Sequence, residues 1–175
     1  MIPIFFDVET NGLHGSVVQF SAIFEKKLYN RYYFPMEDTY NQYSLNIHHL
    51  DAMTIKKKRE ESLHQYPHYF ADDMGFVTNL FKHATILVAH NIKYDIQYIP
   101  QGIIKDNNCF CTMKTNIKRV KAKFKAGGTS FKYPTLQETA EYYGVQIDYD
   151  LHDASVDVDI TRKIFIEMFQ RGLIK

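Results

Sequence analysis

The stretch Ile2–Gly12, IPIFFDVETNG, decides the fold of this chain. It begins as an apolar run, which is typical of a buried β-strand, and it ends with two carboxylates before an Asn-Gly turn signal. Because alternate side chains of a strand share a face, Asp7 and Glu9 are expected on the same side of the sheet. Ligands bind at strand ends in open sheets of this kind, so the sequence predicts an acidic site there.

Other strands are predicted outward from this one. The runs Val17–Phe24 and Leu28–Phe34 are rich in β-branched and aromatic residues, and they predict a hairpin that pairs with the first strand. Ile86–Ala89 and Cys109–Thr112 are short apolar runs of the buried-strand type. Antiparallel strands followed by alternating strands and helices indicate an α/β fold, with a mixed sheet and helices on its faces.

Helices are predicted where apolar residues recur every three or four positions. Asn91 is expected to be the N-cap of one of them, and Gly144 is expected to end another. The predicted helical segments are Asn46–Leu50, Phe70–His83, Ile92–Ile99, Leu136–Tyr143 and Asp153–Phe169.

Length and composition limit the class of protein. The chain has 175 residues, 45% hydrophobic and 23% charged, so we expect a single globular domain over residues 1–175. A net charge of +1 excludes a partner held by bulk positive charge alone. The sequence has no membrane span and no secretory signal at its start, so we expect a cytoplasmic location without membrane contact. Cys109 and Cys111 are expected to be reduced core residues.

Four carboxylates stand out by position, and they converge at the end of the first strand if the last helix crosses that strand end. Asp7 and Glu9 end that strand, Asp95 lies on the helix after Ile86–Ala89, and Asp157 lies near the start of the last helix. A lone aspartate is more often a helix cap or a solvated side chain. Four carboxylates in one place, however, cannot all ionise without a counter-cation, so the cluster predicts a site for hard divalent ions and a phosphate.

Three motifs carry a resemblance to a known family. They are Phe5–Leu13 (FFDVETNGL), Val88–Asp95 (VAHNIKYD) and His152–Asp157 (HDASVD). In order and spacing they resemble the histidine branch (DEDDh, DnaQ-like) of the DEDD superfamily of 3′→5′ exonucleases, which includes the proofreading subunit of bacterial DNA polymerase III. The resemblance implies an RNase H-like fold, with a five-stranded mixed β-sheet flanked by α-helices.

The same resemblance implies a catalytic mechanism and a cofactor. Two Mg²⁺ or Mn²⁺ ions are expected, with Asp7 on both, Glu9 and Asp157 on the first and Asp95 on the second. His152 is the expected general base for the attacking water, because a histidine side chain suits proton transfer near neutral pH. The tyrosine branch of the superfamily is an alternative, because Tyr149 precedes Asp153 at the spacing that this branch uses.

The expected reaction is hydrolysis at the 3′ end of single-stranded nucleic acid, with DNA favoured, releasing nucleoside 5′-monophosphates. By the resemblance, Thr10 contacts the terminal nucleotide through its backbone, Leu13 packs on its base, and Asn91 is a further candidate substrate-binding residue. The alternatives are an RNA-trimming exoribonuclease, an endonuclease of the RNase H type, and a non-catalytic scaffold. A DNA polymerase or another replication protein is the expected protein partner.

The stretch 118–132 is basic, and its role remains open at this point. It is either a solvated loop or a surface that follows a nucleic-acid backbone, with Phe124, Phe131 and Tyr133 available to stack on bases. His90 is expected to be a packing or hydrogen-bonding residue rather than a metal ligand.

Overall fold

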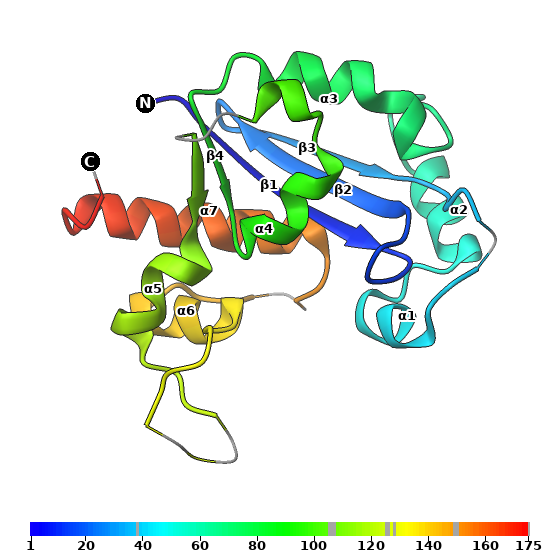
Figure 1. Cartoon of the computed structure of the whole chain (residues 1–175). Coiled ribbons are helices and arrows are strands. Elements are labelled where there is room, and N and C mark those ends of the chain that lie inside the picture. The colour runs from blue at the N-terminus through cyan, green and yellow to red at the C-terminus, as the bar shows by residue number, and fades with distance from the viewer. Residues whose placement is uncertain (38, 105–107, 125–126, 128, 149–150, 175) are drawn as a thin grey trace.

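The centre of the molecule is a five-stranded mixed sheet with the strand order β3-β2-β1-β4-β5. Figure 1 shows the computed structural model, which describes all residues except 38, 105–107, 125–126, 128, 149–150 and 175. β1 pairs antiparallel with β2, which pairs antiparallel with β3, whereas β4 and β5 run parallel to β1. The strands are β1 Pro3–Thr10, β2 Val17–Phe24, β3 Lys27–Tyr32, β4 Ile86–Ala89 and β5 Cys109–Cys111.

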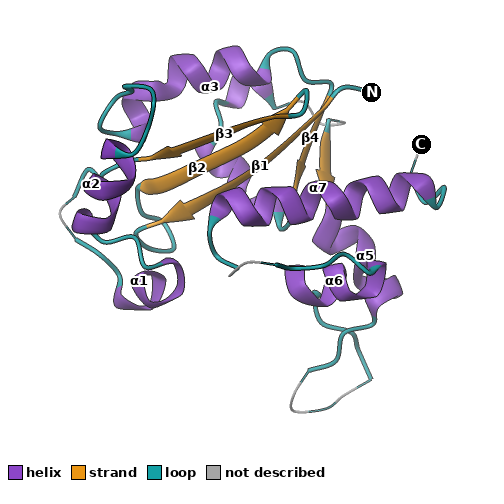
Figure 2. Cartoon of the chain, turned by 180° about the vertical axis from the view of Figure 1, so that it is seen from behind, coloured by secondary structure: helices purple, strands orange, loops and turns teal. Residues whose placement is uncertain are grey.

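Helices pack on both faces of this sheet, as Figure 2 shows from behind. The α-helices are α1 Gln42–His48, α2 Ala52–Glu60, α3 Met74–Phe81, α4 Ile92–Asp95, α5 Thr112–Val120, α6 Leu136–Tyr143 and α7 Ala154–Gln170. Short 3₁₀ helices extend some of them: η1 Phe70–Asp73, η2 Ile96–Tyr98 and η3 Gln101–Ile103. None of the helices in the described ranges is long and apolar enough to cross a bilayer.

The alternation of side chains along β1 divides the core between these two faces. Phe6 is fully buried and meets Phe81 of α3 edge-on, with ring centroids 5.1 Å apart. Phe5 points to the other face and meets Phe165 of α7 at 5.4 Å. β1 therefore contributes side chains to both faces of the sheet. Because its side chains alternate, Phe5, Asp7 and Glu9 lie on the face that α7 covers.

Most of the predicted elements agree with the structure, although α1 spans Gln42–His48 rather than the predicted Asn46–Leu50. Two predicted helices are divided between a 3₁₀ turn and a short α-helix, because Phe70–His83 contains η1 and α3 and Ile92–Ile99 contains α4 and η2. α5 was not predicted, and it contains the first part of the basic stretch. Cys109 is exposed, so its assignment to the core was wrong; it lies on a three-residue strand at the edge of the sheet.

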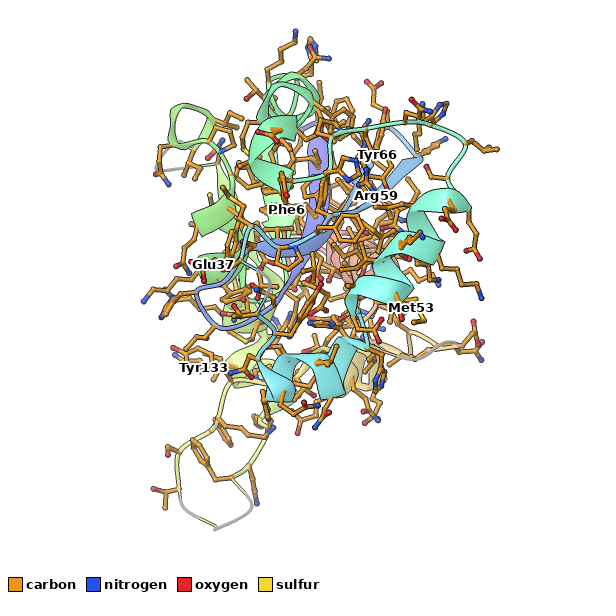
Figure 3. All side chains as sticks on the ribbon, turned by 90° about the vertical axis from the view of Figure 1, so that its right-hand side faces the viewer. Phe6, Glu37, Met53, Arg59, Tyr66 and Tyr133 are labelled. Carbon is orange, nitrogen blue, oxygen red and sulfur yellow. The ribbon has the colours of Figure 1, made fainter. Side chains whose placement is uncertain are left out.

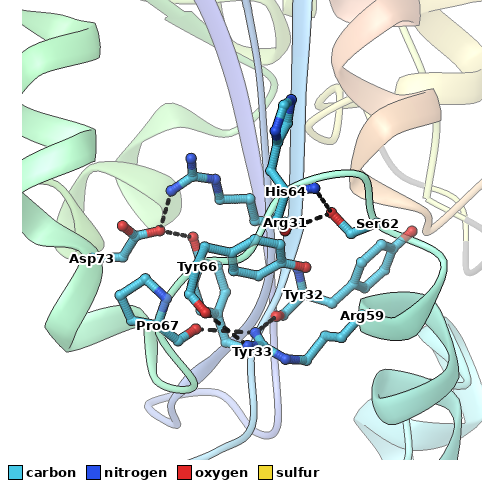
Figure 4. Close-up of polar contacts among 9 residues, drawn as sticks. All are labelled: Arg31, Tyr32, Tyr33, Arg59, Ser62, His64, Tyr66, Pro67 and Asp73. Atoms are coloured by element: carbon cyan, nitrogen blue, oxygen red, sulfur yellow. Dashed lines mark hydrogen bonds and ion pairs between the residues drawn. The ribbon is translucent and has the colours of Figure 1, made fainter.

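A polar network joins β3 to the segments that follow α2. In Figure 3, Arg59 and Tyr66 lie together beside this strand. The Arg59 guanidinium donates to the backbone oxygens of Tyr32, Tyr66 and Pro67 at 2.6, 2.9 and 3.0 Å (Figure 4). One side chain thereby satisfies the last carbonyl of β3 and two carbonyls of the segment after α2, which has no regular secondary structure there.

The same network contains a buried carboxylate. Asp73 accepts hydrogen bonds from Arg31 at 2.5 Å and from the Tyr33 hydroxyl at 2.8 Å (Figure 4). The Arg31 guanidinium also lies 3.4 Å from the ring centroid of Phe76. Asp73 is thus neutralised by a cation of the chain itself.

Candidate active site

Asp7 and Glu9 lie at the end of β1, where the face covered by α7 changes from apolar to acidic. Phe5 on this face packs against Val158 and Phe165 of α7. Two and four residues further along, Asp7 and Glu9 are only half-buried, and the ladder with β2 becomes irregular between Glu9 and Thr10. The strand therefore presents both carboxylates where the packing of α7 on the sheet ends.

The start of α7 brings the third motif to this point. The metal-ligating atoms of Glu9, His152 and Asp157 lie within 4.8 Å of one another. Asp157 is in the first turn of α7, and its two carboxylate oxygens each lie 3.4 Å from the backbone nitrogen of His152. His152 has a left-handed backbone with φ of 73°, and its side chain is exposed. The chain turn thus directs the imidazole back to the carboxylates.

Asp95 reaches the same site from the opposite face of the sheet. It ends α4, it is buried, and its carboxylate accepts a hydrogen bond from the backbone nitrogen of Val8 at 3.3 Å. Val8 lies between Asp7 and Glu9 in β1, so this bond holds Asp95 beside both of them. All four predicted carboxylates and the predicted histidine are therefore brought together.

The electrostatics of the cluster are those of acids without a counter-charge. Burial is the largest cause that raises the pKa of Asp7, followed by repulsion from Asp95, Asp157 and Glu9. Burial and the neighbouring carboxylates raise the pKa of Glu9 to about 9. None of these four acids forms an ion pair with a basic side chain in the described part of the chain.

Two members of the cluster are partly compensated by backbone donors. Burial raises the pKa of Asp95 to about 8, although the Val8 N–H acts to lower it. Burial likewise raises the pKa of Asp157 to about 7, against the hydrogen bond from His152. An oxygen-rich donor set that cannot be fully ionised on its own fits hard divalent cations, which take carboxylate ligands.

Gln19 supports the start of α7, and the sequence analysis missed it. This residue of β2 is almost fully buried, and its amide donates to Asp153 at 2.8 Å and accepts from the Ala154 N–H at 3.2 Å. Asp153 is the N-cap of α7 and also accepts from the Ser155 N–H at 2.8 Å. Burial acts to raise the pKa of Asp153, but the bonds from Ser155 and Gln19 outweigh it and the pKa is lowered. A glutamine within the apolar run of β2 was the available signal.

A pocket of about 480 Å³ adjoins Glu9 on the side of α1. Thr10 forms part of its wall, where its hydroxyl contacts the Gly12 carbonyl at 2.8 Å and the Tyr94 hydroxyl at 2.5 Å. Leu13 is exposed at the rim of the pocket. The residues that line the pocket are Glu9, Thr10, Leu13, Asn41, Tyr43, Ser44, Ile47, His48 and Tyr94.

His48 fixes the strand end from behind this pocket. Its Nδ1 accepts from the Leu50 N–H at 3.0 Å, so its Nε2 carries the proton that it shares with the Thr10 carbonyl at 3.1 Å. Burial is the main cause that lowers the pKa of His48, which agrees with a neutral ring. This hydrogen bond uses one of the two lone pairs of the Thr10 carbonyl oxygen.

Asn91 is exposed and does not cap α4, so that prediction was wrong. Its backbone is left-handed, with φ of 69° and ψ of 41°, and its side chain makes no cap hydrogen bond. An N-cap requires extended backbone angles, from which the side chain can reach the first free N–H groups. Asn91 instead turns the chain from β4 directly into α4. Tyr149, the alternative base, lies outside the described residues.

Comparisons with known proteins show the family and the fold of this chain. The exonuclease family model (RNase_T) matches residues 4–165. The structure of exonuclease X in complex with 5′-overhanging duplex DNA has a TM-score of 0.63 and 16% identity, over 98% of this chain and 93% of that chain. The nuclease domain of 3′hExo, a DEDDh family member bound to rAMP, has a TM-score of 0.61 and 13% identity, over 97% and 91%.

A third similar structure is the Saccharomyces cerevisiae Pan2 pseudoubiquitin hydrolase–RNA exonuclease module with AAGGAA RNA, with a TM-score of 0.65 and 13% identity. The alignment covers 99% of this chain but only 29% of that one. No curated protein matches the chain. These structures share the RNase H-like fold of the mixed sheet. Because the family model covers nearly the whole chain and all three motifs, this protein is an enzyme of the exonuclease family.

Proposed function

We propose that the protein is a metal-dependent 3′→5′ exonuclease that acts on single-stranded nucleic acid, with DNA as the favoured substrate. It hydrolyses the phosphodiester bond at the 3′ end and releases nucleoside 5′-monophosphates. The observation that carries this proposal is the convergence of Glu9, His152 and Asp157 within 4.8 Å, beside Asp7 and Asp95.

The four carboxylates are proposed to hold two divalent ions, Mg²⁺ or Mn²⁺. Asp7 would bind both, Glu9 and Asp157 the first, and Asp95 the second. Bound ions would supply charge stabilisation for the attacking and the leaving oxygen of an in-line displacement. The fit rests on the donor set itself, because the raised pKa values of Glu9 and Asp95 describe carboxylates that lack a cation.

His152 is proposed to take the proton of the attacking water. Its ring is exposed beside Glu9 and Asp157, where water and a strand end can approach it. The pocket next to Glu9 is proposed to receive the terminal nucleotide, with Leu13 against its base and Thr10 against its sugar. The exposed Asn91 is proposed as a further substrate contact at the turn that carries α4.

The test is a cleavage assay with 5′-labelled single-stranded DNA and RNA of one sequence, in Mg²⁺, in Mn²⁺ and in EDTA. We expect a mononucleotide ladder on DNA that EDTA abolishes. A ladder on RNA alone would show that the enzyme is an exoribonuclease instead. Internal fragments would indicate an endonuclease. If neither strand is cut, the chain is a binding scaffold for a partner such as a DNA polymerase.

The identity of the base is tested by substitution. We expect His152→Ala to lower kcat by about 10³-fold, because general-base catalysis contributes about 10²–10⁴-fold. Tyr149→Phe is the control, and it should retain most of the activity. An inactive Tyr149→Phe protein together with an active His152→Ala protein would move the chain to the tyrosine branch.

A further inference from the structure

The last turn of α5 and the hairpin that follows it form a projection, which we call the arm and define as the described residues of 118–133. Lys123 and Phe131 form an antiparallel bridge, and the Lys132 N–H donates to the Ala122 carbonyl at 2.9 Å. In Figures 1 and 2 the arm extends away from α5 and α6, beyond the side of the sheet at which β4 and β5 end. Its two strands pair with each other through these contacts.

The charges of the arm are positive and largely uncompensated. The sequence has no acidic residue between Asp106 and Glu138. Lys118, Lys121 and Lys123 are exposed, and none of them pairs with an acid among the described residues. Among the described lysines of the arm, Lys132 at the base is the one that is paired, with Glu138 at 2.7 Å. Although the net charge of the chain is only +1, lysines without an acidic partner among the described residues are concentrated on the arm.

Exposed aromatic rings lie among these lysines. Phe124 is 50% exposed, Phe131 39% and Tyr133 59%. The rings occur on both strands of the hairpin, and the chain leaves them in contact with water. Aromatic rings beside cations are the surface that binds unpaired nucleic acid, because bases stack on the rings while lysines contact the phosphates.

One side chain joins the base of the arm to the catalytic segment. His90 follows β4 directly and precedes the turn to Asp95. Its Nδ1 lies 3.0 Å from the Thr112 hydroxyl, and its Nε2 lies 3.2 Å from the Pro134 carbonyl. These partners stand before and after the arm in the sequence. The arm is therefore fixed to the same segment that presents Asp95.

We propose that the arm binds the unpaired strand upstream of the 3′ end that enters the active site. Lys118, Lys121 and Lys123 contact its phosphates, and Phe124 and Phe131 stack on its bases. This inference rests on the proposed function, whose substrate it specifies as a strand several nucleotides long rather than a terminal dinucleotide alone. The enzyme accordingly prefers long strands, and binding of those strands depends on salt.

The test compares two triple variants with matched charge loss. The arm variant is Lys118→Gln/Lys121→Gln/Lys123→Gln. The control is Lys26→Gln/Lys56→Gln/Lys57→Gln, whose residues are exposed on other elements and which also includes a lysine with a left-handed backbone, as Lys121 has. Circular dichroism melts establish that both variants are folded. The pair Phe124→Ala/Phe131→Ala tests the stacking separately from the charge.

Binding is measured by fluorescence anisotropy of a labelled 12-nucleotide DNA strand in EDTA, over a series of salt concentrations. At about 0.1 M salt we expect the arm variant to bind at least tenfold more weakly, with a salt slope less steep by about 2, because each phosphate contact contributes about 0.7. The phenylalanine pair should bind about tenfold more weakly with an unchanged slope. The control triple variant should bind with the same affinity and the same salt slope as the unaltered protein.

Cleavage provides the second readout. We expect the ratio of kcat/KM on the 12-nucleotide strand to kcat/KM on a dinucleotide to fall about tenfold in the arm variant. Identical affinity and salt slope in the two triple variants would overturn the proposal. An unaltered protein that cuts neither substrate would instead refute the proposed function, while the binding series in EDTA would still decide the role of the arm.

Discussion

Two buried polar clusters of this molecule differ in how their charges are balanced. Beside β3, Asp73 accepts from Arg31 and from the Tyr33 hydroxyl, so the chain supplies both the charge and the hydrogen bonds. At the end of β1, four carboxylates meet without a basic partner among the described residues. A cluster that the chain completes serves stability, whereas a cluster that it leaves incomplete is kept for a ligand.

The largest expected effect distinguishes the two clusters by activity. We expect Asp7→Asn to lower kcat/KM by about 10⁴-fold, which is about 5.5 kcal/mol of transition-state stabilisation, because it removes a proposed ligand of both ions. The same change should raise the Tm of the metal-free protein at pH 8, because it removes one of the repelling carboxylates. Steady-state kinetics and thermal melts in EDTA measure both effects. A lower metal-free Tm would contradict this view of the cluster.

A smaller effect on activity is expected behind the site. We expect Gln19→Leu to lower kcat about tenfold with little change in KM, because the start of α7 loses the partner that fixes Asp153 and Ala154. Ser21→Ala is the matched control on the same strand, since its hydroxyl donates to the side-chain oxygen of Asn30 at 2.8 Å and not to α7 in the described part of the chain. Equal kcat values for the two variants would remove the positioning role of Gln19.

Substitution in the cluster of Asp73, Arg31 and Tyr33 should change the stability of the fold rather than the activity. We expect Asp73→Ala to destabilise the fold by about 2–3 kcal/mol, because Arg31 and the Tyr33 hydroxyl lose their shared acceptor. Urea denaturation would measure this loss. The kcat of the folded fraction should stay near that of the unaltered protein, and a large fall in kcat with no change in stability would contradict the comparison.

The smallest effect is a dependence of metal-free stability on pH. The folded pKa values of Asp157, Asp95 and Glu9 are raised to about 7, 8 and 9. Between pH 7 and 9 the folded state therefore holds protons that the unfolded state has released, so stability falls as the pH rises. A fall in Tm of about 5 °C is expected in EDTA, since 1 kcal/mol corresponds to about 2–4 °C.

The histidines whose pKa is lowered by burial titrate below this pH range, and there they make the stability of the fold rise with pH. Burial lowers the pKa of His90 to about 4, so its contribution changes only below neutral pH. Added Mg²⁺ or Mn²⁺ should raise the Tm more at pH 9 than at pH 7, because ions and protons compete for the same oxygens. The double variant Glu9→Gln/Asp95→Asn should flatten the profile. A metal-free stability that rises from pH 7 to pH 9 would contradict the prediction, because it would show that the charges of these carboxylates are already balanced within the folded protein.

The sequence predicted the sheet and the acidic site because their signals are local. The alternation in β1 assigns Asp7 and Glu9 to one face, and the motif order brings Asp95 and Asp157 to the same strand end. The failure at Asn91 has a physical cause, since asparagine is favoured both at N-caps and in the left-handed backbone region. Its residue type could not decide between these two conformations.

α5 escaped prediction for a different reason. The buried positions of this helix are the polar residues Thr112 and Asn116, whereas its apolar residues Met113, Ile117 and Val120 recur at helical spacing and were a signal that the sequence analysis did not use. The Asn116 amide is satisfied by the Thr112 carbonyl at 2.8 Å and by the Tyr143 hydroxyl at 2.6 Å. The Thr112 carbonyl belongs to α5 itself, but the Tyr143 hydroxyl comes from α6, and local periodicity does not contain such a tertiary contact.

The hydrogen bonds of His90 to Thr112 and Pro134 determine where residues can be inserted into or removed from this fold. Because one imidazole holds the chain on both sides of the arm, the segment between them can be lengthened or shortened without moving the catalytic strand ends. Each doubling of a flexible loop costs only about 0.6 kcal/mol in closure entropy. The fold thus offers an insertion point at which substrate preference can be redesigned while the hydrolytic centre is left intact.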